Sequence, residues 1–182
     1  MKNKYIIGAM LVGIISLFAS CSDDNDSNPT LIQPTEFKLN TPEYVNSTID
    51  LEHSTELSLS WSQPKYTADN APINVTYEVQ VSPTNSFTVS TDEAAADESG
   101  EKVADYAALS HTTLECKTSA SAEEIDKALV KILKLTEDNV PAEQDAYVRV
   151  NAFILEGTNR LNPIASNSVQ LKVKPYYIEL KD

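Results

Sequence analysis

The sequence predicts an all-β fold, a Greek-key sandwich of about seven strands with one inserted amphipathic helix. Two observations carry this prediction. Short runs of alternating apolar and polar residues recur along residues 35–175, and a period of two is typical of strands with one buried face. Residues 121–134 instead place their apolar side chains at helical spacing.

The first 20 residues have the pattern of an export signal. Lys2 and Lys4 form a short basic region, and residues 5–19 are mostly apolar. This stretch is shorter than the roughly 20 apolar residues that a bilayer span needs, and it ends at small residues. We therefore expect residues 1–20 to be a signal peptide, and not a transmembrane helix or a core helix.

The stretch Leu17-Phe18-Ala19-Ser20-Cys21 resembles the lipobox of bacterial lipoproteins, which are cleaved just before the cysteine. The resemblance implies that Cys21 carries acyl chains, and two or more chains give stable membrane anchoring. The run Ser22-Asp23-Asp24-Asn25-Asp26 resembles the export signal of lipoproteins that face the cell exterior. The expected localisation is the outer membrane, lipid-anchored and outward-facing.

Residues 21–34 are rich in Asp, Asn, Ser, Thr and Pro, a composition typical of a flexible tether. The acidic cluster at 23–26 lacks the alternating ligands, the glycine and the closing glutamate of an EF-hand loop, so no metal site is predicted. The chain has a formal net charge of −13, which disfavours binding to nucleic acid. Residues 176–182 are expected to form a tail or linker.

Alternation is clearest in two strands. In the first, Leu57, Leu59 and Trp61 share one face, which places Trp61 in the core. In the second, residues 75–81, the polar side chains Thr76, Glu78 and Gln80 are expected to face water. The full set of expected strands is 36–39, 48–51, 57–61, 75–81, 106–117, 147–154 and 168–174, with turns at 69–72 and 156–159.

Residues 121–134 begin with Ser121 and Glu124 in capping-box spacing, and their apolar stripe is expected to close one edge of the sandwich. Residues 91–102 are acidic and alanine-rich, which favours a long loop with a helical turn at 92–97, or disorder. Leu114 and Cys116 share one face of an extended segment, so Cys116 is expected to be a small buried hydrophobe.

Three of these strands resemble a fibronectin type III or immunoglobulin-like sandwich, through Trp61, Tyr77–Val81 and Val148–Ala152. Together with the lipobox and helix 121–134, they also resemble, in order, the amino-terminal domain of SusE-like outer-membrane lipoproteins of starch utilisation. The resemblance implies a non-catalytic domain in starch or glycan uptake. It also implies partners: a TonB-dependent transporter, a SusD-like lipoprotein and a glycan.

The function expected from this resemblance is that of a spacer and docking domain. A stand-alone glycan-binding module is an alternative, and it would use the 69–72 turn, the 91–102 loop or exposed tyrosines. The candidate contact residues are Tyr66, Tyr176 and Tyr177. A third alternative is an adhesin-type protein-binding domain that uses an exposed edge strand.

Enzyme chemistry has little support in the sequence. His53 and His111 stand apart, and we find no nucleophile elbow, zinc-binding helix motif or phosphate-binding loop. No constellation of residues fits a catalytic site, so no catalytic residue and no cofactor are predicted.

Overall fold

A computed structural model of the chain describes residues 30–69 and 71–180. Contacts divide the chain into residues 1–30 and 31–182, so nearly all described residues belong to the second unit. Its elements are β1 (Leu31–Ile32), the 3-10 helix η2 (Glu43–Asn46), β2 (Thr48–Asp50), β3 (Glu56–Ser60), β4 (Thr67–Ala68), β5 (Ala71–Pro72), β6 (Thr76–Ser82), α1 (Thr91–Ala95), β7 (Ala107–Thr113), β8 (Lys117–Ser121), α2 (Ala122–Leu133), β9 (Gln144–Glu156), β10 (Asn159–Ala165) and β11 (Val169–Lys174).

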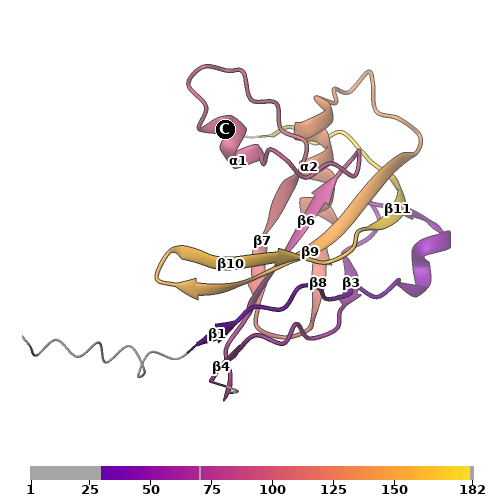
Figure 1. The fold of residues 1–182 in the computed structure, drawn as a ribbon. Helices are drawn as coiled ribbons and strands as arrows, with labels where there is room; N and C mark the ends of the chain where they lie inside the picture. The colour runs from indigo at the N-terminus through magenta and orange to yellow at the C-terminus, as the bar shows by residue number, and fades with distance from the viewer. Residues whose placement is uncertain (1–29, 70, 181–182) are drawn as a thin grey trace, which may run out of the picture. The chain divides into compact units, whose positions relative to one another are not determined.

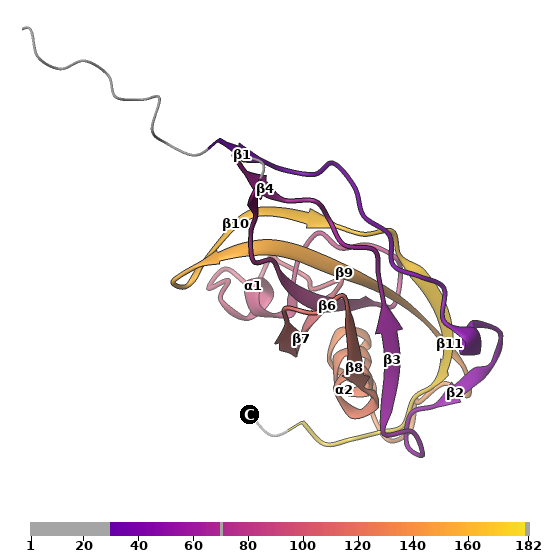
Figure 2. The same cartoon turned by 90° about the horizontal axis from the view of Figure 1, so that it is seen from below.

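The strands form two packed layers and a small ribbon (Figures 1 and 2). The larger sheet is six-stranded, in the order β2-β11-β9-β6-β7, with β10 also paired to β9. The smaller sheet is the antiparallel pair β3-β8, and β1, β4 and β5 form the ribbon. Every pairing in the larger sheet is antiparallel except that of β2 with β11. The predicted all-β sandwich with an inserted helix is confirmed.

The core lies between the two sheets and is built from the alternating faces that the sequence predicts. Trp61, directly after β3, is 4% exposed, and its ring centroid lies 5.3 Å from that of Tyr77 on β6. Apolar side chains of the larger sheet meet them there: Val79, Val81, Val148, Val150, Ala152, Val169, Leu171 and Val173. Burying such side chains contributes about 1.5–3 kcal/mol each, which makes this core the main source of stability.

The outer face of β6 contradicts the sequence prediction. Thr76, Glu78 and Gln80 do not face water; each is at most 8% exposed. The side chain of Arg149 on β9 donates from Nε to Gln80 Oε1 over 2.8 Å, and its guanidinium lies 4.0 Å from the ring of Phe87. Because a segment beyond β6 brings Phe87 back over this face, β6 is buried on both sides.

The segment 91–102 has a defined local structure. The helix α1 begins at a complete capping box, in which Glu93 N donates to Ser90 Oγ over 3.0 Å and Ser90 N donates to Glu93 Oε2 over 2.8 Å. After the helix, Asp97 accepts from the backbone N–H of Lys102 over 2.8 Å. Serine and carboxylate side chains thus satisfy the backbone where the sequence offers few apolar residues.

Helix α2 lies where the sequence predicts it, but its capping box is only half formed. Ser121 Oγ accepts from Glu124 N over 3.3 Å, whereas the Glu124 carboxylate accepts from the backbone N–H and the hydroxyl of Ser110 on β7. Ile125 and Leu129 are fully buried, as the helical spacing requires. The helix therefore packs its apolar stripe on the core and also closes part of the edge of β7.

The predicted extended segment 106–117 is two strands in two different sheets. The chain turns between β7 and β8, so Leu114 is 65% exposed instead of sharing a buried face with Cys116. Cys116 is half-buried against the core, with Sγ 3.6 Å from the hydroxyl of Tyr77. Among the described residues it is the one free cysteine.

The predicted turn at 156–159 is the tip of a longer hairpin. β9 and β10 continue the pairing beyond the sandwich, with Arg160 opposite Leu155 and Leu161 opposite Ile154. The register shifts between Leu161 and Ile164, where Asn162 has a φ of 49°. Such a bulge leaves backbone groups unpaired within the ladder and available to side chains.

The structure describes the amino-terminal part of the chain only from residue 30. The predicted signal peptide, residues 1–20, and the predicted acylation site Cys21 lie outside the described residues. The end of the predicted tether contains β1, which pairs with β4, and the predicted strand 36–39 contributes only a bridge between Leu39 and Trp61. None of the described helices combines the length and apolar character that crossing a bilayer requires.

Candidate functional site

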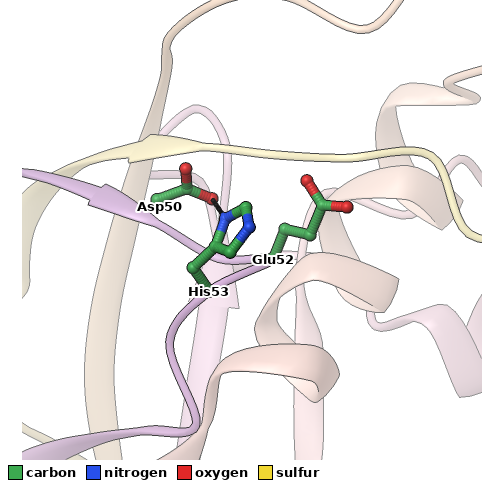
Figure 3. Close-up of side chains that lie close together, drawn as sticks. All are labelled: Asp50, Glu52 and His53. Carbon is green, nitrogen blue, oxygen red and sulfur yellow. Dashed lines mark ion pairs between the residues drawn. The ribbon is translucent and has the colours of Figure 1, made fainter.

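One cluster of potential metal ligands occurs among the described residues, at the last residue of β2 and just after it. Figure 3 shows Asp50, Glu52 and His53, which offer ligand atoms within 4.8 Å of one another. His53 Nδ1 lies 3.2 Å from Asp50 Oδ1, while Lys174 Nζ on β11 lies 2.9 Å from Asp50 Oδ2. The Asp50 carboxylate is therefore contacted by the Lys174 ammonium on one oxygen and by the His53 ring on the other.

These contacts set the ionisation of the cluster. Hydrogen bonds from Lys174 and then His53 lower the pKa of Asp50 to about 2. The same contact raises the pKa of Lys174, so both groups are charged at neutral pH. Because the ammonium is seated on the carboxylate, a metal ion would have to displace it. The arrangement fits an ion pair that fastens β2 to β11.

A second titratable group is buried between α2 and the segment after β11. Asp126 is fully buried, and its Oδ1 accepts from the backbone N–H of Tyr176 over 3.0 Å. Its Oδ2 has no hydrogen-bond partner among the described residues. Burial raises the pKa of Asp126 to about 6, and the nearby Glu52 acts in the same direction. Asp126 thus holds the carboxy-terminal segment on the helix, at an electrostatic cost.

Tyr66, predicted as an exposed contact residue, is 2% exposed, so that prediction is wrong. Its hydroxyl donates to the bulge carbonyl of Asn162 over 2.6 Å, and the Ala152 carbonyl lies 3.2 Å away. Burial raises its pKa to about 12. Tyr66 is a clamp between β10 and the core, because the bulge frees a carbonyl that the tyrosine can reach.

The other two predicted tyrosines lie on the segment after β11. Tyr176 is half-buried and packs against the core, whereas Tyr177 is 42% exposed. Tyr177 borders an open groove of about 500 Å³ that also contacts Lys131, Lys134 and Glu179. The structure does not bring the three tyrosines together, because Tyr66 lies at the bulge of β10 and Tyr177 lies beside the end of α2.

The outer face of the β3-β8 sheet forms a second open groove, of about 550 Å³. Most of its lining side chains are polar, and none is Phe, Tyr or Trp: Ser58, Leu59, Ser60, His111, Thr113, Glu115, Lys117, Thr118 and Ser119. A sugar ring stacks on flat apolar faces, so this groove offers hydrogen bonds without a stacking platform. His111 is the one histidine among these lining residues.

Sequence reasoning missed the buried polar network of the large sheet. Arg160 Nη2 lies 2.5 Å from Glu78 Oε2, and Gln80 Nε2 donates to Glu78 Oε1 over 3.1 Å. Arg149 completes the network through Gln80. The guanidinium groups of Arg149 and Arg160 lie 4.0 and 4.7 Å from the ring centroids of Phe87 and Phe153. One signal was available in the sequence, because alternation places Arg149 and Phe153 on the same face of one strand.

The described chain begins and ends at opposite ends of β6 (Figure 1). Gln33, just after β1, donates to the carbonyl of Asn162 in the bulge of β10. The hydroxyl of Tyr66 contacts the carbonyls of both Asn162 and Ala152, and Ala152 pairs with Tyr77 at the start of β6. Leu180 borders a groove beside Ala107, which pairs with Val81 near the end of β6. The sandwich therefore separates the two ends of the described chain along the direction of β6.

Comparison with protein-family models gives a match over residues 23–151, to the SusE outer membrane protein family. The match starts two residues after Cys21 and stops within β9, although β10 and β11 complete the same sheet. It covers β1 to β8, α2 and both partners of the Trp61–Tyr77 contact. This chain belongs to the SusE outer membrane protein family.

Proposed function

We propose that this protein is a non-catalytic, surface-exposed lipoprotein whose sandwich serves as a spacer and docking domain in the uptake of starch or another glycan. Acyl chains on Cys21 hold it to the outer membrane, and residues 21–34 are its tether. Its partners are a TonB-dependent transporter and a SusD-like lipoprotein in the same membrane.

One observation carries the spacer role: the described chain enters and leaves at opposite ends of β6 (Figure 1). A strand of seven residues spans about 20 Å, so the sandwich holds its far end at least that distance from the tethered end. A tethered domain is confined near its membrane partners, which raises its effective concentration for them.

The distribution of aromatic side chains supports docking over direct sugar binding. Trp61 and Tyr66 are buried, and Tyr177 is the single aromatic side chain in the described residues that is exposed. Affinity electrophoresis of the detergent-solubilised protein in starch-containing gels is expected to show no retardation. Retardation that Tyr177→Ala abolishes would support the glycan-binding module instead.

Anchoring is tested by labelling growing cells with radioactive palmitate. The wild-type protein is expected to carry label and to fractionate with the outer membrane, and Cys21→Ala is expected to lose the label. Cys116→Ala, which changes the other cysteine of the chain, should stay labelled and is the matched control. Label that persists in Cys21→Ala would overturn the anchor.

Docking is tested by co-purification of the acylated protein with the outer-membrane transporter and the SusD-like lipoprotein. The proposal requires both partners in the eluate from wild-type cells. If the acylated protein is present in the membrane and neither partner elutes with it, the docking role is excluded while the anchor stands.

A further inference from the structure

Four exposed apolar side chains lie on two elements at one end of the sandwich. Leu31 and Ile32 of β1 are 37% and 52% exposed, and Leu155 and Leu161 of the β9-β10 hairpin are 53% and 38% exposed. Both views place β1 beside this hairpin (Figures 1 and 2). We call these four side chains the apolar end. They are half of the large exposed hydrophobic side chains in the described residues.

The apolar end is held in a fixed arrangement. Gln33 Nε2, next to β1, donates to the carbonyl oxygens of Asn162 and Pro163 over 3.3 and 3.4 Å. Tyr66 donates to the same Asn162 carbonyl from the core side. The bulge of β10 thus joins the segment after β1 to the hairpin, which holds the two elements that carry the four apolar side chains in place.

This end carries little charge in a strongly acidic protein. Residues 30–35 contain no charged side chain, and residues 155–165 contain only Glu156 and Arg160, within a chain of net charge −13. An acidic face is repelled by anionic lipid headgroups, whereas a neutral apolar face is not. The apolar end therefore meets less electrostatic repulsion from an anionic membrane than the acidic parts of the chain, such as residues 91–102.

The side chains also surround the hairpin instead of forming one flat patch. Leu155 pairs with Arg160 and Leu161 pairs with Ile154, and neighbouring pairs along a ribbon point to opposite faces. A flat protein partner covers one face, while a lipid interface takes up apolar side chains on both faces of an inserted tip. The geometry therefore favours a membrane interface over a second protein as the occupant.

The short stretch of chain between Cys21 and β1 limits how far the apolar end can lie from the anchor. Cys21 lies ten residues before Leu31, and a fully extended chain covers at most about 3.3–3.6 Å per residue. Leu31 therefore lies at most about 35 Å from Cys21. Leu31 and Ile32 are the large exposed hydrophobic side chains of the described residues that are nearest to Cys21 in sequence. We propose that the apolar end inserts into the lipid surface that holds the anchor, which fixes the orientation of the sandwich. This inference rests on the proposed acylation of Cys21.

The test uses the full acylated protein in vesicles of phosphatidylcholine and phosphatidylglycerol with brominated acyl chains, which quench nearby tryptophan emission. Leu155→Trp introduces a reporter at the hairpin, and Val103→Trp, at a site that is 70% exposed in the loop between α1 and β7, is the matched control. Trp61 is 4% exposed and serves as an internal reference in both.

The expected result is that brominated lipid removes most of the emission added by Leu155→Trp and leaves that of Val103→Trp and Trp61 unchanged. Equal quenching of the two reporters would overturn the inference. If a second copy of the protein covers the apolar end instead, quenching of the Leu155→Trp reporter would be absent and light scattering would detect dimers. Mass spectrometry of the same sample separates the two proposals, because a missing acyl mass refutes the anchor and acylated but unquenched protein refutes the insertion.

Discussion

Arg160 on β10 reaches across β9 to place Nη2 2.5 Å from Oε2 of Glu78 on β6. Glu78 is 2% exposed, whereas the Arg160 side chain is 49% exposed. The guanidinium passes over the ring of Phe153, at 4.7 Å from its centroid. The pair therefore joins a fully desolvated anion to a cation that still contacts water, and the two partners are not equivalent.

This asymmetry predicts unequal effects of two substitutions. Arg160→Met leaves a buried carboxylate without its cation and is expected to lower the free energy of unfolding by about 2 kcal/mol, less than the range for fully buried pairs. Glu78→Gln is expected to cost less, because the freed Arg160 hydrates. Urea denaturation followed by Trp61 emission measures both. A larger loss for Glu78→Gln would show that the desolvation argument is wrong.

Asp126 gives a prediction about pH. Its pKa is raised from 3.8 to about 6, so the folded protein binds the proton more tightly than the unfolded chain. Its contribution to stability is full below about pH 4 and is lost as the pH rises through about 6. Asp126→Asn keeps an acceptor for the Tyr176 N–H and removes the buried charge, so it is expected to be more stable than wild type by about 2–3 kcal/mol at pH 8.

The measurement is urea denaturation at pH 4, 6 and 8, where the two proteins should agree at pH 4 and diverge above it. Asp50→Asn is a control for which the stability difference from wild type is expected to depend on pH in the opposite direction. The pKa of Asp50 is lowered to about 2, so its contribution is present above about pH 4 and lost only as the pH falls towards 2. A constant difference between wild type and Asp126→Asn across pH would exclude a titrating Asp126.

Tyr66→Phe removes the hydroxyl that clamps the bulge of β10. The loss is expected to cost about 1–2 kcal/mol, because the Asn162 carbonyl keeps only the contact from Gln33. Amide hydrogen exchange should accelerate in residues 159–165 more than in β11. Tyr177→Phe, on an exposed ring, is the control and should leave both quantities unchanged. Uniform acceleration along the whole sheet would contradict a local clamp.

Glu124→Ala exposes part of the edge of β7. The Glu124 carboxylate accepts from the backbone N–H and hydroxyl of Ser110, so its removal leaves a free strand edge, which favours pairing between chains. Analytical ultracentrifugation is expected to show concentration-dependent association of the variant. Glu123→Ala breaks only an exposed ion pair with Lys127, so this control variant should sediment like the wild-type protein. A monomeric Glu124→Ala would show that this edge is protected by other means.

The sequence predicted those parts of the fold that depend on local periodicity. The strands around Trp61 and Val148, and the helix with Ile125 and Leu129, have one apolar face each, and the structure buries these faces. Period-two and helical spacing describe one face of one element at a time. This is why the sandwich and its inserted helix could be expected before the structure was known.

The failures share a cause, which is that a distant segment changed the surroundings of a residue. The sequence predicts that Glu78 and Gln80 face water. In the structure, the segment with Phe87 and the side chain of Arg149 cover them. Tyr66 is predicted to be exposed because nothing near it in the sequence indicates a partner. Its partner in the structure is the Asn162 carbonyl, which a bulge far along the chain frees. Such contacts join residues that no local pattern relates.

The interruption between β10 and β11 has a consequence for how relatives of this protein can differ. At Ser166 the backbone N–H and the hydroxyl both bond to Val150, and Asn167 bonds to the backbone of Leu39, so the register of β11 is set independently of the hairpin beyond. The hairpin arm can thus grow or shrink between homologues without disturbing the core. Insertions and deletions should accumulate around Gly157, where evolution can adjust the reach of the arm while the rest of the domain stays the same size.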